Sequence, residues 1–201
     1  MIRHLLPALL VGSSLALADL PPAIAMEARE VVLRPNAEEA RWLPAGDDWR
    51  RRGSGETRFL GLRLYRATLW TAAPPPPAGD SPANLLAAPH ALTLRYVRDF
   101  SRDTLVEASL REMRRLGATA AQLALWKDDL ARVFPDVKAG EVITGLHRPG
   151  RGAWFLHQGQ PTGEVADPEF ARRFFGIWLD PRSRDPDLRA QLVATPGGTG
   201  Q

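Results

Sequence analysis

Hydrophobic and polar residues alternate along several stretches of the chain, a pattern typical of half-buried β-strands. The clearest stretch is RFLGLRLYRATLWT, residues 58–71, in which both faces of the predicted strand carry apolar side chains. We expect such a strand to be covered on one side and to line a cavity on the other. Before it, residues 29–35 predict a first strand, and residues 40–58 predict a strand end followed by a turn-rich segment.

A second group of strand signals follows. Residues 91–99 alternate cleanly and place Tyr96 on the apolar face. Residues 141–147 and 153–159 are also strand-like, and Pro and Gly occupy the turn RPGRG between them. This combination predicts an antiparallel hairpin.

Amphipathic helices are predicted from their capping residues. Each helix starts at a side chain that can accept a hydrogen bond from the first turn. These residues are Ser101, Thr119, Asp167 and Asp185. Gly117 can end the first helix, Pro135 ends the second, and Pro168 and Pro186 suit the first position of the last two. Strands followed by a helix pair, a hairpin and terminal helices predict an α+β fold, a large antiparallel sheet with helices packed on one face.

The helix that begins near Phe170 has a broad apolar stripe. On a helical wheel, apolar side chains from Phe170 to Trp178 cover about half of the circumference. One contact with a sheet needs less than that. We therefore expect Phe174 and Trp178 to pack on the sheet and the edge of the stripe to line a cleft.

The N-terminus has the pattern of a signal peptide, because Arg3 and His4 precede an apolar run over residues 5–17 and small residues follow. We expect cleavage after Ala25, with Ala18 as the alternative. The run is shorter than the roughly 20 residues that span a bilayer, so no integral membrane segment is expected after signal removal. The protein is predicted to be periplasmic or secreted. Its predicted parts are a signal peptide at 1–25, one domain at 26–193 and a disordered tail at 194–201.

Composition and charge argue against several classes of function. The chain has 201 residues and a formal net charge of +3, and only Lys127 and Lys138 among its 26 basic residues are lysines. The arginines are scattered and form no basic stripe of the kind that binds nucleic acid. We interpret the short cluster at residues 50–52 as a solvated turn. The chain has no glycine-rich phosphate loop, and without cysteine it can form no disulfide.

Neither a metal site nor a nucleophilic triad is predicted. Beyond the signal peptide, the histidines are His90, His147 and His157. In the predicted hairpin, His147 and His157 share a face but lie about 13 Å apart, which is four residues at roughly 3.3 Å each. One metal ion cannot bridge that distance, so we interpret the histidines as isolated. Ser54 in GSGET lacks the spacing of a nucleophile elbow.

The remaining candidate for a functional site is a set of polar side chains among apolar ones on the longest predicted strand. Arg58, Arg63 and Tyr65 lie there beside Phe59 and Leu69. A guanidinium between apolar walls can hold a carboxylate or a phenolate through two hydrogen bonds. The alternative for each arginine is an ion pair with a helix carboxylate.

Four motifs occur in order along residues 53–192, and the similarity they carry covers about residues 30–192. They are GSGETRFLGLRLYRATLW, LTLRYVRDFSRDTLVEASLREMRRLG, FPDVKAGEVITGLHRPGRGAWFLHQGQPTGEV and DPEFARRFFGIWLDPRSRDPDLRAQL. Together they resemble the bacterial chalcone isomerase-like family. The resemblance implies an open-faced β-sandwich with a cleft between sheet and helices for a flat apolar ligand. Plant members of the family cyclise chalcones without a cofactor, whereas other members resemble fatty-acid-binding proteins with no known reaction.

The family's functional residues carry over only in part. Arg58 falls at the active-site arginine, which in the plant enzymes lies near the reacting ketone, and Tyr65 falls where those enzymes have a threonine. The plant tyrosine and asparagine fall near Ser101 and Ala108, and a further plant threonine falls near Arg173. These departures argue against efficient chalcone cyclisation, because that reaction depends on orienting the substrate and stabilising an oxyanion.

Three functions follow as hypotheses. The first is the binding of a small apolar ligand, such as a fatty acid or a polyketide- or flavonoid-like compound, without a cofactor or a metal. The second is an isomerase of the chalcone isomerase type acting on an unsaturated carbonyl compound, and the third is an envelope scaffold protein. No oligomeric state is predicted. The candidate ligand-binding residues are Arg58, Phe59, Arg63, Tyr65, Leu69, Arg173 and Phe174. The catalytic candidates, by resemblance, are Arg58 and Tyr65.

Overall fold

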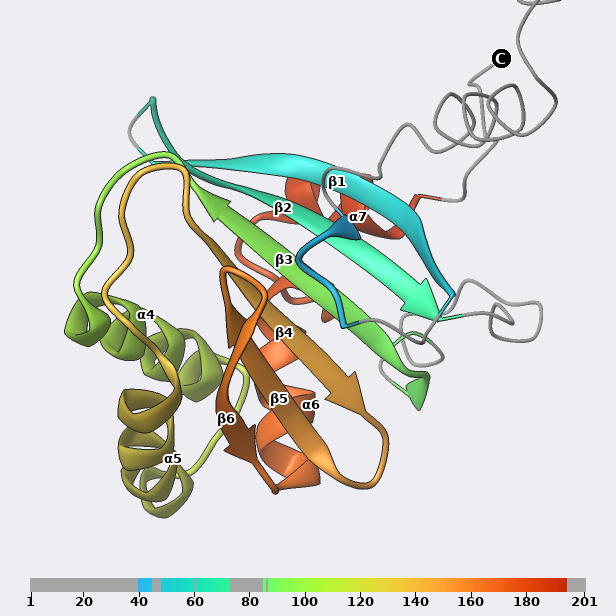
Figure 1. The fold of residues 1–201 in the computed structure, drawn as a ribbon. Helices are drawn as coiled ribbons and strands as arrows, with labels where there is room; N and C mark the ends of the chain where they lie inside the picture. The colour runs from blue at the N-terminus through green and yellow to red at the C-terminus, as the bar shows by residue number, and fades with distance from the viewer. Residues whose placement is uncertain (1–39, 45–47, 60, 73–84, 86, 195–201) are drawn as a thin grey trace, which may run out of the picture. The chain divides into compact units, whose positions relative to one another are not determined.

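The computed structural model describes residues 40–44, 48–59, 61–72, 85 and 87–194, with only the backbone at residue 59. In this part of the chain, six strands form one antiparallel sheet in which each strand pairs with its neighbours in sequence (Figure 1). The strands are β1 (Trp49–Phe59), β2 (Leu62–Ala72), β3 (His90–Tyr96), β4 (Val142–Arg148), β5 (Gly152–His157) and β6 (Gln160–Val165).

The helices gather on one face of this sheet, so the predicted α+β, open-faced architecture is confirmed. They are α4 (Arg102–Arg115), α5 (Ala120–Val133), α6 (Pro168–Leu179) and α7 (Pro186–Val193). Helix α6 packs on β5 and α7 packs on β1 and β2, while α4 packs on α5 and α6 (Figure 1). Among the described residues, no helix is long and apolar enough to cross a membrane.

The predicted helix caps are confirmed. Ser101 accepts a hydrogen bond from the backbone of Thr104 at the start of α4, and Thr119 forms a full capping box with Gln122 at the start of α5. Asp167 and Asp185 cap the last two helices, each followed by proline at the first position. These short-range patterns need no tertiary context, which is why the sequence predicts them well.

The prediction of one strand over residues 58–71 is wrong. The chain turns between β1 and β2, where Gly61 has a φ of +79°, and the two strands form a hairpin. Residues 49–57, predicted as part of a turn-rich segment that included the arginines at 50–52, belong to the edge strand β1. Within β2 the expected alternation holds, since Leu69 enters the core under the helices and Trp70 packs on the opposite face of the sheet.

Two glycines in β1 explain why this strand looks like a loop in sequence. Gly53 and Gly55 face α7, and a Cβ atom at Gly53 would lie 2.1 Å from the carbonyl oxygen of Gln191. A Cβ at Gly55 would lie 2.8 Å from Cδ1 of Leu188. The helix therefore rests almost directly on the strand backbone, which only glycine permits.

The histidines of the central strands are not isolated, contrary to the prediction. His90 on β3 lies opposite His147 on β4, and their ring centroids are 4.6 Å apart. The ring of Phe175 packs edge-on against both. Nδ1 of His90 and Nδ1 of His147 lie 2.9 Å and 3.2 Å from the carbonyl oxygen of Ala88. The sequence gives no sign of this pair, because it depends on the pairing of strands that are distant in the chain.

Three predictions fall on residues outside the described part of the chain. They are the signal peptide at 1–25, the strand at 29–35 and nearly all of the tail at 194–201. One strand was not predicted at all, namely β6, whose Pro161 and Gly163 weaken the strand pattern. Both residues are tolerated because β6 is at the edge of the sheet.

Candidate functional site: an apolar cavity and an adjoining groove

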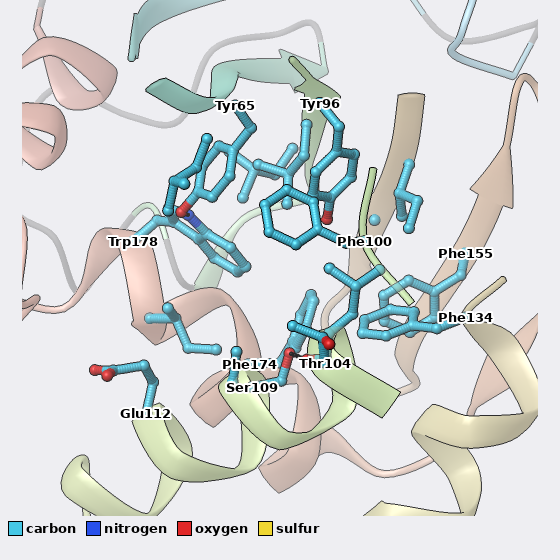
Figure 2. A pocket seen from close by; sticks show the side chains of 18 residues that line it. Tyr65, Tyr96, Phe100, Thr104, Ser109, Glu112, Phe134, Phe155, Phe174 and Trp178 are labelled. Atoms are coloured by element: carbon cyan, nitrogen blue, oxygen red, sulfur yellow. Dashed lines mark hydrogen bonds between the residues drawn. The ribbon is translucent and has the colours of Figure 1, made fainter. Parts of the chain in front are cut away.

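A cavity of about 170 Å3 lies between the sheet and the helices. Its walls come from β2 to β5 on one side and from α4 and α6 on the other, and Figure 2 shows their side chains converging on it. The lining is mostly apolar and aromatic. It consists of Leu64, Tyr65, Leu92, Leu94, Tyr96, Phe100, Thr104, Leu105, Ala108, Ser109, Glu112, Phe134, Ile143, Gly145, Phe155, Phe174, Ile177 and Trp178.

Helix α6 supplies a large part of the wall. Phe174 and Trp178, predicted to pack on the sheet, both line the cavity, and Phe174 also contacts Phe155 of β5 with ring centroids 5.2 Å apart. Phe170 and Phe175 fill the solid core instead and are fully buried. Ile177, at the edge of the apolar stripe, lines the cavity as expected, and the centre of the stripe lines it as well.

At one side of the cavity, Tyr65 and Trp178 form a hydrogen-bonded pair. The indole Nε1 of Trp178 donates to the hydroxyl of Tyr65 over 3.0 Å (Figure 2). Burial raises the pKa of Tyr65 above its usual value near 10, so the phenol is neutral at physiological pH. The pair joins β2 to α6 and presents a polar boundary to an otherwise apolar space.

An open groove of about 740 Å3 adjoins the cavity at this boundary. The cavity and the groove share five lining residues, namely Leu64, Tyr65, Glu112, Ile177 and Trp178. The rest of the groove comes from β1, α4, the segment that joins α6 to α7, and α7 itself. Its charged residues are Glu56, Arg58, Arg111, Arg184, Asp185 and Asp187, together with Glu112.

Most of the carboxylates in the groove already have partners. Glu56 lies 3.5 Å from both Arg58 and Arg63. Glu112 pairs with Arg184 at 3.1 Å and also with Arg115 outside the groove. Asp185 caps α7 and accepts a hydrogen bond from Thr57.

Arg111 differs from the other groove arginines. It is exposed on α4 and forms no ion pair with any described residue. An anion that enters the groove would therefore meet one guanidinium that is not already neutralised.

The predicted site residues fall in different places. Tyr65 and Phe174 line the cavity, and Arg58 lines the groove with its side chain 61% exposed. Arg63 contacts Glu56 and lines neither space. Leu69 is fully buried in the core and also lies outside both linings.

Two predicted site residues remain, namely Arg173 and Phe59. The guanidinium of Arg173 donates to Glu169 over 2.7 Å and to the carbonyl of Leu116. It thereby ties α6 to the end of α4 and does not reach the cavity. The side chain of Phe59 lies outside the described part of the chain.

Several lining residues were not predicted as site residues. Tyr96 was placed on the inward face of its strand, and the periodicity of α4 put Ser109 on an apolar face, but neither pattern indicates a cavity. Arg111 and Arg184 carry no sequence signal, because one is a surface residue of a helix and the other lies in a loop. Among the described residues, no group of three His, Asp or Glu side chains is placed to hold a metal ion.

The fold and the site together define a class of α+β protein in which an open-faced sheet and its helices enclose a small apolar cavity. A family model described as chalcone isomerase-like matches residues 46–194. The chain therefore belongs to the chalcone isomerase-like family.

Similar proteins occur both among solved structures and among curated sequences. A solved structure, the Arabidopsis thaliana fatty-acid binding protein, superimposes with a TM-score of 0.59 and 16% sequence identity, over 75% of this chain and 90% of that chain. This likeness supports the fold. A protein of Haemophilus influenzae described as uncharacterized is 24% identical over 105 residues, which is 52% of each chain. The chain thus spans about half the length of that curated relative.

Proposed function

We propose that this protein binds a small apolar ligand with an anionic end, such as a fatty acid. The apolar part lies in the cavity and the anionic end lies in the groove, on the other side of Tyr65 and Trp178. One observation carries the proposal: an apolar cavity adjoins a groove that contains the unneutralised guanidinium of Arg111. The name of the Arabidopsis relative agrees with a ligand of this class.

The dimensions of the cavity support an elongated ligand. An apolar cavity of roughly 150 Å3 holds one benzene molecule, so the cavity of about 170 Å3 has room for a single ring or a short acyl segment. A longer ligand must continue past Tyr65 into the groove. Ligand sites typically span roughly 300 to 1,000 Å3, and the groove supplies the remaining volume.

Chalcone cyclisation is the alternative, and three side-chain environments argue against it. Ala108 offers only a methyl group to the cavity. Ser101 is occupied as the cap of α4, and Arg173 is held by Glu169 and Leu116. A developing oxyanion would therefore receive no hydrogen bond from these three positions. We expect the absorbance of added chalcone to fall no faster than in buffer, and a faster loss that Arg58→Ala abolishes would favour the isomerase.

Titration of delipidated protein with dodecanoic acid tests the binding. Arg111→Ala should weaken the affinity about tenfold, because a hydrogen bond to a charged group contributes about 1.5 kcal/mol or more. Arg58→Ala should weaken it severalfold. Arg114→Ala is the matched control, since Arg114 is exposed on the same helix and does not line the groove, and it should change the affinity less than twofold.

The outcome is decided by the comparison of these variants. Lipid found by mass spectrometry in extracts of the purified protein would support the proposal further. If the extracts carry no lipid and Arg58→Ala and Arg111→Ala bind like Arg114→Ala, the proposal is wrong.

In this proposal the protein acts in the periplasm or outside the cell, because residues 1–25 have the pattern of a signal peptide. N-terminal sequencing of the protein from a periplasmic fraction should begin at Met26. A full-length chain retained in the cytoplasm would contradict this part of the proposal.

A further inference from the structure

The cavity contains one hydrogen-bond donor that the described part of the protein does not use. Tyr96 is only 5% exposed, and its ring packs edge-on against Tyr65 and Phe100. Figure 2 shows its hydroxyl directed into the cavity. Among the described residues, this hydroxyl has no hydrogen-bond partner.

The other polar side chains of the cavity are engaged. The Ser109 hydroxyl donates to the carbonyl of Leu105 over 2.8 Å, and the Thr104 hydroxyl lies 2.8 Å from that of Ser101. The Tyr65 hydroxyl accepts from Trp178 and also forms a side-chain hydrogen bond with Thr57, and Glu112 pairs with two arginines. Tyr96 is therefore distinct from its neighbours in the cavity.

A hydroxyl that becomes sealed from water without a partner costs about 1–3 kcal/mol relative to one that is hydrogen-bonded. Burial also raises the pKa of Tyr96, so the phenol keeps its proton and remains a donor. A ligand that fills the cavity with carbon alone would seal this donor in an apolar space. A ligand with an oxygen at the right position would satisfy it.

We propose that the ligand carries a hydrogen-bond acceptor, a carbonyl or hydroxyl oxygen, within its apolar part, and that the Tyr96 hydroxyl donates to this oxygen. The ligand class is then an oxygenated acyl chain or an aryl ketone with an anionic end, and not a plain saturated fatty acid. This inference rests on the proposed function, since it assumes that the cavity holds the apolar part of the ligand.

The test compares dodecanoic acid with a series of dodecanoic acids that carry one oxo group at successive positions. One or two positions should bind about 3- to 10-fold more tightly than the plain acid, which is the effect of one net hydrogen bond. Tyr96→Phe keeps the ring and should abolish this preference, while its affinity for the plain acid stays equal or rises. Thr71→Val is the control, because it removes a buried hydroxyl of β2 that lines neither the cavity nor the groove, and it should keep the preference.

The outcomes separate this inference from the proposed function. If wild-type protein binds the plain acid and shows no preference for any oxo position, a trapped water satisfies Tyr96 and the inference is wrong. A preference that survives in Tyr96→Phe also overturns it. If no acid binds to the wild-type protein, the proposed function itself fails.

Discussion

Phe174 and Phe175 are neighbours on α6, yet their side chains belong to two different parts of the interior. Phe175 is fully buried against His90 and His147, where the space between sheet and helix is solid. Phe174 lines the cavity under α4. Two consecutive residues of one helix thus mark the boundary between close-packed core and open space.

The solid part is packed so tightly that it needs residues without side chains. Gly53 and Gly55 let α7 contact the backbone of β1. Protein interiors normally have few voids larger than a water molecule. A fold that packs one part this closely and leaves a cavity in another therefore localises ligand binding to the second part.

The largest expected effect concerns the solid part and is pH-dependent. Burial, with the nearby His147, lowers the pKa of His90 to about 3, and burial also lowers the pKa of His147. In the unfolded chain a histidine titrates near 6.5. Between these values the unfolded chain binds a proton that the folded chain does not, so stability falls as the pH falls. His90 alone should remove about 3 kcal/mol between pH 6.5 and pH 4, at about 1.4 kcal/mol per pH unit.

Urea unfolding of wild type and His90→Phe at a series of pH values measures this effect. The variant should lose much less stability on acidification, because carboxylates contribute equally to both proteins. His147→Phe should give a smaller change in the same direction, and it serves as the second variant if His90→Phe does not fold. His157→Gln is the control, since His157 lies on another strand beside Glu141. Equal pH dependence in wild type and His90→Phe would contradict the buried pair.

The next largest effect is expected from a substitution at the contact of α7 with β1. Gly53→Ala places a Cβ 2.1 Å from the carbonyl oxygen of Gln191 and 2.7 Å from that of Leu192, so the helix must shift. Overpacking of this kind costs about 2 kcal/mol. Ser54→Ala on the opposite face loses only a hydrogen bond from Arg66 and should cost less than about 1 kcal/mol. Similar midpoints of urea denaturation for the two variants would rule out the close contact.

The solid part was also the harder part to predict from sequence. Helix caps and the hairpin over residues 142–157 depend on neighbouring residues, and they were predicted correctly. Gly53 and Gly55 lower strand propensity, so β1 looked like a loop. Glycine is needed at both positions because α7, which is distant from β1 in the sequence, contacts them. The His90 and His147 pair was missed for the same reason.

The candidate site was predicted only in outline. The apolar faces of β2, β3 and α6 indicated a cleft between sheet and helices, and Tyr65 and Phe174 do line the cavity. Arg63 and Arg173 have the right chemistry, but their positions depend on the Gly61 turn and on the partner Glu169, which alternation does not reveal. The volume of a cavity depends on side chains from five or more elements and has no local pattern.

A substitution in the cavity wall should affect binding more than stability. Ala108→Phe adds a ring to a space of about 170 Å3, which is about the size that one ring fills. The affinity for dodecanoic acid should fall tenfold or more, with little change in the midpoint of thermal unfolding. Ala131→Phe on α5 is the matched control, because Ala131 is also partly buried but does not line the cavity. Wild-type affinity in Ala108→Phe would mean that the ligand lies elsewhere.

The smallest effect separates the two tyrosines of the cavity. Tyr65→Phe leaves Nε1 of Trp178 without its acceptor and should lower the free energy of unfolding by about 1 kcal/mol. Tyr96→Phe removes a hydroxyl that has no partner among the described residues, so the ligand-free protein should keep its stability or gain slightly. Urea unfolding of the delipidated variants makes this comparison. An equal loss in both would mean that the Tyr96 hydroxyl is already bonded in solution, and its role as a donor to a ligand would then have to be abandoned.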